Sequence, residues 1–477
     1  MNTMLMLALR NLMRNRRRSL ATLAALAIGA ASILMFGGYS TNIRYSMETA
    51  YVRTGGHLQI QHRDFNLYGS GDPTAYGIRD AERIVDAIRR DEVLGPKLVV
   101  ATPTLQFGGI AGNYGAGVSK TVVGFGLQAS ENARMREWNH YDIPLVSPPF
   151  ALLNSRPDSA IVGVGVARVL QLCATLKIAN CPQPEKDVPA AGGAAMPDDI
   201  LALTQREQNA PRGKGGSRAA AVAAPPPSPR RIELLASSTR GTPNVAALEV
   251  VEAEGQGFKE LDEVFVAVHL AQAQRLVFGR APPKATAIML QLQRPDQMAG
   301  AAERLRAKLP EWSGQQPLAV LDLEELNPFF LQTIQLFNTI FGFIFVLIGS
   351  LVLFSVSNTM NTAVVERTVE IGTLRAMGLR KHGIRQLFMI EGFLLGAAGA
   401  VGGALVALLA SALINSLGLE WLPPGSAEAL PLVLRIWGEN GMIVGTTLGL
   451  IVVATVSAWW PAHRAAKLNV VDALRHA

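Results

Sequence analysis

Charged residues are scarce in this sequence. They account for 17% of its 477 residues, while apolar residues account for 49%, and a soluble protein usually carries about 25% charge. About 20 consecutive apolar residues are enough to span a bilayer as a helix. Four runs of this length contain no charged residue, at residues 20–39, 334–361, 392–416 and 441–461. The sequence therefore predicts four transmembrane helices.

The four runs also lack histidine, so no side chain within them can relay a proton or bind a coupling cation by charge. Ion-coupled transporters place such side chains inside their spans, and this class is therefore excluded. Polarity in the second run comes from uncharged residues such as Asn338 and Ser350. We expect the energy for any transport to come from outside the bilayer. Four helices are too few to enclose a pathway, so we also expect a second copy or a homologue.

Motifs that carry chemistry are equally scarce. The sequence has no G-x-x-x-x-G-K-[ST] loop, which holds the phosphates of nucleotides in many ATPases. No nucleophile or cluster of metal ligands stands out. We therefore predict a non-enzymatic chain with no catalytic residue, no metal and no cofactor bound to it. His57 and His62 are isolated, and we predict that they are solvated loop residues.

The net charge of +7 is unevenly distributed around the four runs. Loops that stay in the cytoplasm carry an excess of Lys and Arg, and three segments have this excess: Arg10, Arg14, Arg16, Arg17 and Arg18; Arg367, Arg375, Arg380, Lys381 and Arg385; Arg464, Lys467 and Arg475. The connection between the third and fourth runs has one cation, Arg435, against three glutamates. This pattern places both termini in the cytoplasm and residues 43–332 outside. A cleaved signal peptide in place of the first span would also leave that segment outside.

The predicted organisation has nine parts. They are an amphipathic cytoplasmic helix over residues 1–19, spans over residues 20–42, 333–361, 392–416 and 441–461, an α+β extracytoplasmic domain over residues 43–332, a cytoplasmic helix and loop over residues 362–391, a short outer loop over residues 417–440 and a cytoplasmic tail over residues 462–477. A merely basic tail is the alternative for residues 1–19. The segment 182–231 is rich in Pro, Ala and Gly and cannot bury enough apolar surface to order itself, so we predict a flexible insert.

Short patterns within the extracytoplasmic domain indicate individual elements. Alternation of apolar and polar residues predicts a strand at residues 57–61, and short apolar stretches between turn residues predict further strands at residues 98–102, 121–125, 245–251, 263–268 and 287–293. Helical periodicity predicts helices at residues 79–90, 270–277 and 296–309. After Pro328 no strong breaker precedes the second span, so its helix should project beyond the membrane and connect rigidly to the domain.

Cysteine is almost absent. Cys173 and Cys181 are the only two, and both fall in the segment expected outside the cytoplasm, where disulfides persist. We predict a disulfide that closes a small loop; two free thiols are the alternative.

Glycines and tryptophans mark the membrane segments. Six glycines form pairs four residues apart, a spacing that lets helices approach closely: Gly392 and Gly396, Gly399 and Gly403, Gly445 and Gly449. We expect these glycines to pack the third and fourth spans tightly against other helices, either within the chain or at the interface between two copies. Trp421, Trp437, Trp459 and Trp460 fit the interfacial belts of a membrane protein.

The segment after the second span is the most informative. It reads Glu366-Arg367-Thr368-Val369-Glu370-Ile371-Gly372-Thr373-Leu374-Arg375-Ala376-Met377-Gly378 and continues to Glu391-Gly392. From its spacing alone, Arg367 should pair with Glu370, and the charged side chains Glu366, Arg367, Glu370 and Arg375 should project toward the cytoplasm.

This segment resembles the signature E-R-x-x-E-I-G-x-x-R-A-x-G of MacB/FtsX-like permeases, the type VII ABC exporters that include the lipoprotein-releasing permeases. Further matches lie at residues 9–17, at Trp460-Pro461-Ala462, at residues 464–466 and at residues 471–475. In the outer domain, residues 257–262 and 271–276 look like lipoprotein-releasing relatives. The likeness covers nearly the whole chain except the insert.

The resemblance implies a role for each part. Residues 366–378 would be a coupling helix seated on a separate ABC ATPase subunit, with contacts from Glu366, Arg367, Glu370, Gly372, Arg375 and Gly378. ATP and Mg would be bound by that subunit, which acts as a dimer. Its closure would move the periplasmic domains through the helices, which is mechanotransmission in the bacterial inner membrane.

Three functions stay open at this point. The first is export or extraction of a lipophilic or peptide cargo such as a lipoprotein. The second is transmission of a signal to a periplasmic hydrolase, adaptor or sensor. The third is a membrane-anchored receptor without an ATPase. Membrane lipids are expected partners and nucleic acid is not, because the cations gather at the membrane.

Overall fold

The computed structural model describes residues 2–14, 16–69, 72–144, 148–178, 229–237, 242–257, 259–421 and 430–468. Four helices within these ranges are long and apolar enough to cross a membrane, which confirms their predicted number. They are α2 (Arg16–Gly55), α13 (Pro328–Glu366), α15 (Lys381–Ser416) and α16 (Asn440–Lys467). Each is longer than the span predicted for it.

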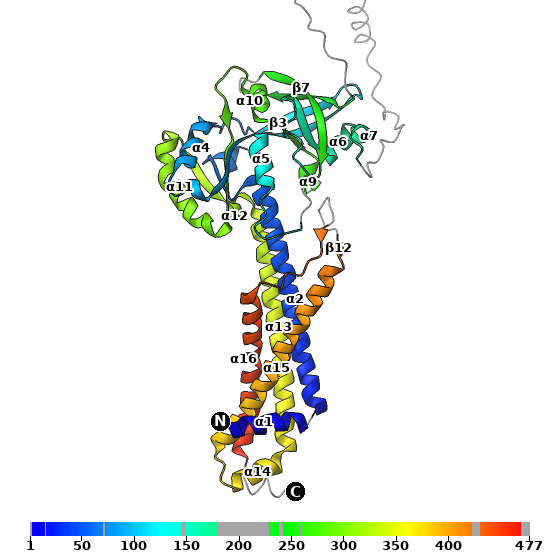
Figure 1. The fold of residues 1–477 in the computed structure, drawn as a ribbon, viewed down its shortest axis with the longest axis vertical. Helices are drawn as coiled ribbons and strands as arrows, with labels where there is room; N and C mark the ends of the chain where they lie inside the picture. The colour runs from blue at the N-terminus through cyan, green and yellow to red at the C-terminus, as the bar shows by residue number, and fades with distance from the viewer. Residues whose placement is uncertain are drawn as a thin grey trace, which may run out of the picture.

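The four helices form a bundle. The helices α2 and α13 run side by side and continue beyond the others to the domain that contains the β-sheet, whereas α15 and α16 end lower (Figure 1). At the opposite end lie α1 (Asn2–Arg14) and α14 (Thr368–Ala376). The bundle core is made of apolar side chains from all four long helices, among them Ile33, Val356, Leu395 and Leu450.

The sheet domain, residues 58–322, comes between α2 and α13 in the sequence. Its main sheet has nine strands among the described residues, which pair in the order β11-β1-β10-β3-β4-β8-β5-β7-β6, and β6 also pairs with β3. The strands are β1 (Leu58–His62), β3 (Leu98–Asn113), β4 (Val118–Leu127), β5 (Ser159–Gly163), β6 (Arg231–Ser237), β7 (Pro243–Glu254), β8 (Phe265–His269), β10 (Ala287–Leu292) and β11 (Leu318–Asp322). Short two-stranded pairs are made by β2 (Ile78–Arg79) with β9 (Lys284–Ala285), and by β12 (Glu420–Trp421) with β13 (Leu430–Pro431).

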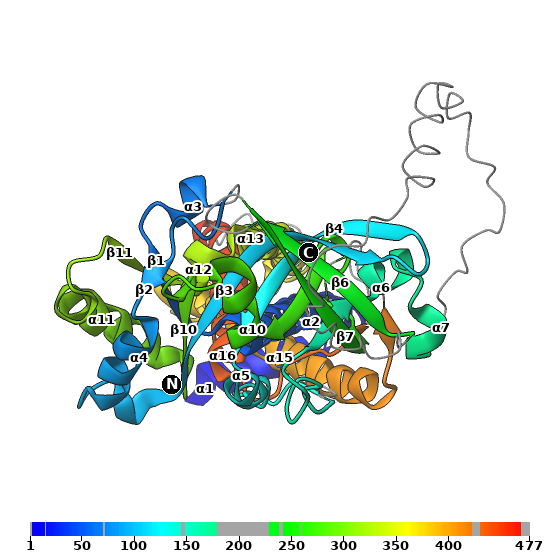
Figure 2. The ribbon, with the colours of Figure 1, turned by 90° about the horizontal axis from the view of Figure 1, so that it is seen from above.

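The long strand β3 divides the sheet domain into two lobes. Residues 98–104 of β3 pair with β10, whereas residues 105–113 pair with β4, and part of them also with β6. The second lobe therefore closes on itself through the β3–β6 pairing, like a small barrel. Each lobe has its own apolar core, and Figure 2 shows the two lobes on either side of β3.

Helices pack against the strands of both lobes. The first lobe packs α4 (Ala81–Arg90) and α11 (Met298–Ser313), and the second packs α6 (Val164–Val169) and α10 (Leu270–Phe278). In α4 the buried side chains Ile84, Val85 and Ile88 recur at helical spacing, which is why this segment forms an amphipathic helix. The other short helices in the described part of the domain are α3 (Phe65–Tyr68), α5 (Ala129–Arg136), α7 (Cys173–Leu176), α9 (Lys259–Asp262), α12 (Leu323–Leu326) and the 3-10 turns Gly95–Lys97 and Pro295–Gln297.

A capped turn connects the sheet domain to α13. The Asp322 carboxylate accepts hydrogen bonds from the backbone N–H groups of Glu324 and Glu325, and the Glu325 carboxylate accepts one from the N–H of Asp322. This reciprocal cap ends β11 and starts α12. Asn327 alone separates α12 from α13. Pro328 begins α13, and its fixed φ suits the first turn of a helix.

The six predicted strands and three predicted helices of this domain are confirmed, with shifts of a few residues at most of their ends. The exception is β3, which was predicted to end at residue 102 and runs on to Asn113. The strands β5, β6 and β11 were not predicted. β6 begins at Arg231, so the predicted insert 182–231 is wrong at its last residue; residues 182–228 lie outside the described residues.

Candidate functional site

The short helix α14 is set between two long helices by local backbone geometry. Arg367 leaves helical conformation at φ −108° and ψ 20°, which ends α13 and begins α14. At the other end, the N–H of Leu379 donates to the carbonyl of Leu374 and the N–H of Gly378 donates to that of Arg375. This is the Schellman pattern, and Gly378 has the positive φ of +98° that it requires.

A buried ion pair fixes α14 to the bundle. Arg367 Nη1 lies 3.0 Å from Glu391 Oε1, and the two residues are only 6% and 1% exposed. The Asn11 amide donates to the same Glu391 oxygen at 2.7 Å, and Arg367 Nη2 donates to the Asn11 carbonyl at 3.0 Å. We call these three residues the Arg367 cluster. It ties α1, α14 and α15 together.

The Arg367 cluster overturns one prediction from the sequence. Arg367 does not pair with Glu370 and does not project from the surface. It points inward because Glu391, in the next long helix, is a buried carboxylate that needs a charged partner. Glu370 instead pairs with Arg14, at 2.6 Å.

The other charged groups of this segment also contact the chain itself. Glu366 accepts two hydrogen bonds from Arg18, at 2.8 and 2.9 Å. Arg375 donates to the carbonyl of Leu468, just after α16. The pairs made by Glu366 and Glu370 are partly exposed, and such pairs contribute about 0–1 kcal/mol each. The Arg367 cluster is thus the main electrostatic anchor of α14.

The exposed face of α14 is more apolar than its sequence suggests. Gly372 and Ile371 are buried against the bundle, while Val369 and Thr373 are exposed. Met377, just after the helix, is 72% exposed, and Val365, just before it, is also exposed. A partner that met this end of the molecule would therefore contact a stripe of apolar and small side chains flanked by the two ion pairs.

The predicted glycines meet neighbours within the chain at five of six positions. A Cβ atom at Gly392 or Gly396 would lie within 2.7 Å of an alanine Cβ on α16, and one at Gly399 or Gly403 would lie at 2.4 Å from atoms of α2. Gly449 faces Phe345 at 3.1 Å, a looser contact, whereas a Cβ at Gly445 would meet nothing within 4 Å. Gly445 therefore does not bring two helices of this chain together, and the alternative of a dimer seam at this position stays a prediction.

A second cluster lies where the bundle meets the sheet domain. The rings of Tyr45 and Tyr141 stack with centroids 4.0 Å apart and planes 4° from parallel. Tyr141 donates its hydroxyl to the buried Glu48 at 3.0 Å, and Tyr45 donates to Glu439 at 3.1 Å. Arg435 donates to the backbone carbonyl of Tyr141 and lies 5.3 Å from the centre of the Tyr45 ring. These five residues form the Tyr141 cluster.

The Tyr141 cluster joins three segments that are distant in the sequence. Tyr45 and Glu48 belong to α2, Tyr141 to the sheet domain, and Arg435 and Glu439 to the connection before α16. Burial, with the nearby Glu48 carboxylate, raises the pKa of the Tyr141 hydroxyl above its ordinary value. A tyrosine hydroxyl is already protonated at neutral pH, and the raised pKa keeps the Tyr141 hydroxyl a donor at more alkaline pH as well.

His57 belongs to this same junction, so its prediction as a solvated residue is wrong. It is 1% exposed, its Nδ1 accepts the N–H of Leu292 at 3.0 Å, and its ring stands edge-on to Trp138 at 5.0 Å. Burial, with His140 nearby, lowers its pKa to about 4. His62 is half-buried in β1 beside Asp64, at 3.9 Å, and is likewise not a solvated loop residue.

Two further predictions concern cysteine and tryptophan. Cys173 begins α7 and is disulfide-bonded; Cys181 lies outside the described residues. The side chains of Trp437, Trp459 and Trp460 are exposed, as an interfacial belt requires, and the side chain of Trp421 is not described.

Among the described residues no group of three or more His, Cys, Asp or Glu side chains is placed to hold a metal ion.

The sequence reasoning missed most partners in both clusters. Glu391 was noted only as part of a motif, although a lone carboxylate in a long apolar helix usually has a buried cationic partner, and Arg367 was the available candidate. Asn11 and Arg18 were seen as parts of a basic segment. Tyr45, Glu48 and Tyr141 gave no signal, because their meeting depends on the tertiary fold.

The chain shows similarity to known permeases, mainly in its C-terminal part. Residues 339–470 match a family described as FtsX-like permease C-terminal. An uncharacterised ABC transporter permease of Methanocaldococcus jannaschii is 28% identical over 177 residues, which are 36% of this chain and 42% of that protein. The ABC transporter permease YtrF of Bacillus subtilis is 33% identical over 159 residues, which are 32% of this chain and 35% of YtrF.

The macrolide export ATP-binding/permease protein MacB of Escherichia coli (strain K12) is 35% identical over 143 residues, which are 30% of this chain and 20% of MacB. The chain thus spans less than half the length of each of these relatives. Among solved structures, the periplasmic region of MacB from Actinobacillus actinomycetemcomitans covers 60% of this chain and 95% of its own, with 10% identity and a TM-score of 0.30.

Proposed function

Because the chain contains an FtsX-like permease domain at residues 339–470, we propose that it is the membrane-spanning subunit of an ATP-driven exporter that works by mechanotransmission. One observation carries this proposal. α13 is a single helix of 39 residues from the sheet domain to α14, about 58 Å at 1.5 Å per residue. A displacement of α14 is therefore delivered along an unbroken rod to the sheet domain.

Charge supports the orientation in the bacterial inner membrane. The arginines of α1 and of the start of α2 lie at the α14 end, together with Arg464 and Lys467 of α16. Cations gather on the cytoplasmic side of membrane proteins. We therefore place α1 and α14 in the cytoplasm and the sheet domain in the periplasm.

The motor in this proposal is a separate ABC ATPase dimer that binds ATP and Mg. It would contact the exposed stripe of α14, chiefly Val369 and Met377, rather than the charged residues. Those residues have partners within the chain, and their part is to hold α14 rigidly. Gly372 contributes by close packing and Gly378 by ending the helix.

A second copy, or a homologue, would complete the transporter. Away from the bundle, the part of α13 nearer to the sheet domain exposes large apolar side chains, among them Leu336, Phe343, Val346 and Leu347. Helices in lipid associate through packing rather than through burial from water, and the uncovered Gly342 and Gly349 leave room for it. The cargo that fits this arrangement is a lipophilic or peptide molecule, such as a lipoprotein, handled by the periplasmic domains.

Co-purification of ATP hydrolysis tests the proposal. The full chain is purified from its own membranes, and its vanadate-sensitive ATPase activity is measured for Met377→Glu and for Leu67→Glu. The two side chains are equally exposed, at 72% and 73%, but Leu67 lies in the sheet domain. The proposal predicts that Met377→Glu loses most of the activity and that Leu67→Glu keeps it. Equal activity in both variants, or none with the unaltered chain, contradicts it.

A further inference from the structure

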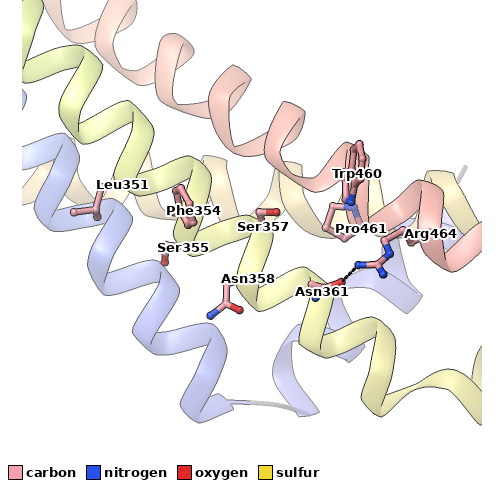
Figure 3. A pocket seen from close by; sticks show the side chains of 9 residues that line it. All are labelled: Leu351, Phe354, Ser355, Ser357, Asn358, Asn361, Trp460, Pro461 and Arg464. Atoms are coloured by element: carbon pink, nitrogen blue, oxygen red, sulfur yellow. Dashed lines mark hydrogen bonds between the residues drawn. The ribbon is translucent and has the colours of Figure 1, made fainter.

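A groove lies between the ends of α13 and α16 that are nearer to α14. Its volume is about 690 Å³, and its lining includes Leu351, Phe354, Asn358, Asn361, Trp460 and Arg464. Figure 3 shows the apolar side chains Leu351 and Phe354 at one end and Asn361 and Arg464 at the other. The lining therefore changes from apolar to polar along the helix.

The length of this gradient suits an amphipathic ligand. Leu351 and Asn361 are ten residues apart on one helix, which is about 15 Å at 1.5 Å per residue. The apolar end lies toward the middle of the bundle and the polar end toward the arginines that mark the membrane surface. A molecule with a polar head and an apolar chain, aligned with the helices, matches both ends.

Two polar side chains that line the groove, Ser357 and Asn358, differ from polar side chains beside the groove on the same helix. The hydroxyl of Ser350 donates to the carbonyl of Val346 and that of Thr362 to the carbonyl of Asn358, as hydroxyl groups in membrane helices usually do. In contrast, Ser357 and the Asn358 amide make no side-chain hydrogen bond to any described residue. Polar groups left unpaired in lipid are costly, so something that can hydrogen bond should meet them.

The charge of the groove specifies the head group. No lining residue described by the structure is acidic. Arg464 makes one long contact, 3.5 Å from its Nη1 to Asn361 Oδ1, which leaves its other N–H groups available. A guanidinium fork is well suited to phosphate, and the exposed indole of Trp460 is typical of residues at head-group level.

We propose that this groove binds one anionic phospholipid. Arg464 and the amides of Asn358 and Asn361 bind its phosphate, and Leu351 and Phe354 contact an acyl chain. The inference depends on the four helices spanning a membrane, but it is independent of the ATPase and of the cargo, so either proposal can fail without the other.

Native mass spectrometry of the full chain tests the site. The chain is purified in detergent, stripped of lipid and titrated with phosphatidylglycerol. Arg464→Gln should weaken retention of the first bound lipid by roughly tenfold, as expected for loss of a charge-assisted hydrogen bond. Asn358→Leu, which keeps the arginine, should weaken it less. Lys467→Gln is the matched control, because Lys467 is an exposed cation on the same helix that does not line the groove.

Three outcomes overturn the inference. Equal retention by Arg464→Gln and Lys467→Gln shows that lipid binds only through the general positive charge. Displacement of the lipid by excess inorganic phosphate shows a site for free phosphate. An oxidative cross-link between two chains through Ser357→Cys shows that a second copy fills the groove. Circular dichroism of each variant checks that it remains folded.

Discussion

The two ends of the bundle are held by different kinds of contact. The Arg367 cluster at the α14 end is a single buried ion pair with one amide. The Tyr141 cluster at the sheet-domain end is a ring stack, two hydroxyl-to-carboxylate hydrogen bonds and a bound arginine. A buried ion pair fails abruptly when one partner is lost, whereas distributed contacts can be exchanged one at a time. Under the proposed mechanism, the rigid attachment would lie where force enters and the adjustable one where force is delivered.

The strongest challenge to this comparison is Glu391→Gln. The substitution keeps an oxygen for Asn11 but leaves the Arg367 charge buried without a counter-charge, so we expect a loss of roughly 3–5 kcal/mol in the free energy of unfolding. Denaturant unfolding in detergent, followed by circular dichroism, measures it. The double variant Arg367→Met, Glu391→Leu should recover most of the loss, because it removes both charges. Unchanged stability of Glu391→Gln means that the pair is not the anchor.

Acid should weaken the sheet-domain end through His57. The folded pKa is lowered to about 4 from an unfolded value of about 6.5, so protons favour the unfolded state below pH 6.5. The stabilisation is complete above pH 6.5 and is lost as the pH falls toward 4, by about 3 kcal/mol in all. Comparing the pH dependence of unfolding of the unaltered chain with that of His57→Asn isolates this contribution. Identical slopes for the two proteins rule out a buried neutral histidine.

Removing single hydroxyl groups sharpens the comparison within the Tyr141 cluster. Tyr141→Phe leaves the buried Glu48 without its donor and should cost about 2 kcal/mol, since burial makes an unsatisfied carboxylate expensive. Tyr45→Phe removes a similar bond to the less buried Glu439 and should cost about half as much. Thermal unfolding of both variants measures the ranking. The reverse order, with Tyr45→Phe the more damaging, would indicate that the connection before α16 carries the junction.

The smallest effect is expected at the exposed pair of Arg14 and Glu370. Arg14→Gln should change stability by less than about 1 kcal/mol, and added salt should remove even that difference, because exposed ion pairs are weak and screened. Unfolding of this variant at low and high salt makes the measurement. A loss as large as that of Glu391→Gln would mean that the surface pairs, and not the Arg367 cluster, anchor α14.

The sequence predicted features that depend on local pattern. Apolar runs located the four long helices, alternation located β1, and a short apolar stretch located β10. The motif around Glu370 marked α14, but the pairing of its charges was mispredicted, because the nearest partner in sequence was not the nearest in space. Arg367 turned inward to satisfy Glu391, 24 positions away. β6 was missed because it directly follows a segment without apolar pattern, and its pairing with β3 depends on closure of the whole lobe.

The junction could not have been predicted from one sequence. Tyr45 and Tyr141 are separated by nearly one hundred residues. Neither has a neighbouring sequence pattern that distinguishes it from a tyrosine on the protein surface. His57 seemed isolated because its partners Trp138 and Leu292 come from other strands and loops. Burial of this kind is decided by packing between elements, which no window along the chain records.

Transmission along α13 is tested most directly by a distance measurement across the molecule. The full chain and its ATPase are reconstituted in lipid nanodiscs, with spin labels at Leu67→Cys of two copies, and the distance between labels is measured with and without ATP and vanadate. The account predicts a nucleotide-dependent change that disappears when a short flexible glycine insert follows Gln332, where α13 leaves the sheet domain. A change that persists despite the insert would contradict transmission through a continuous helix.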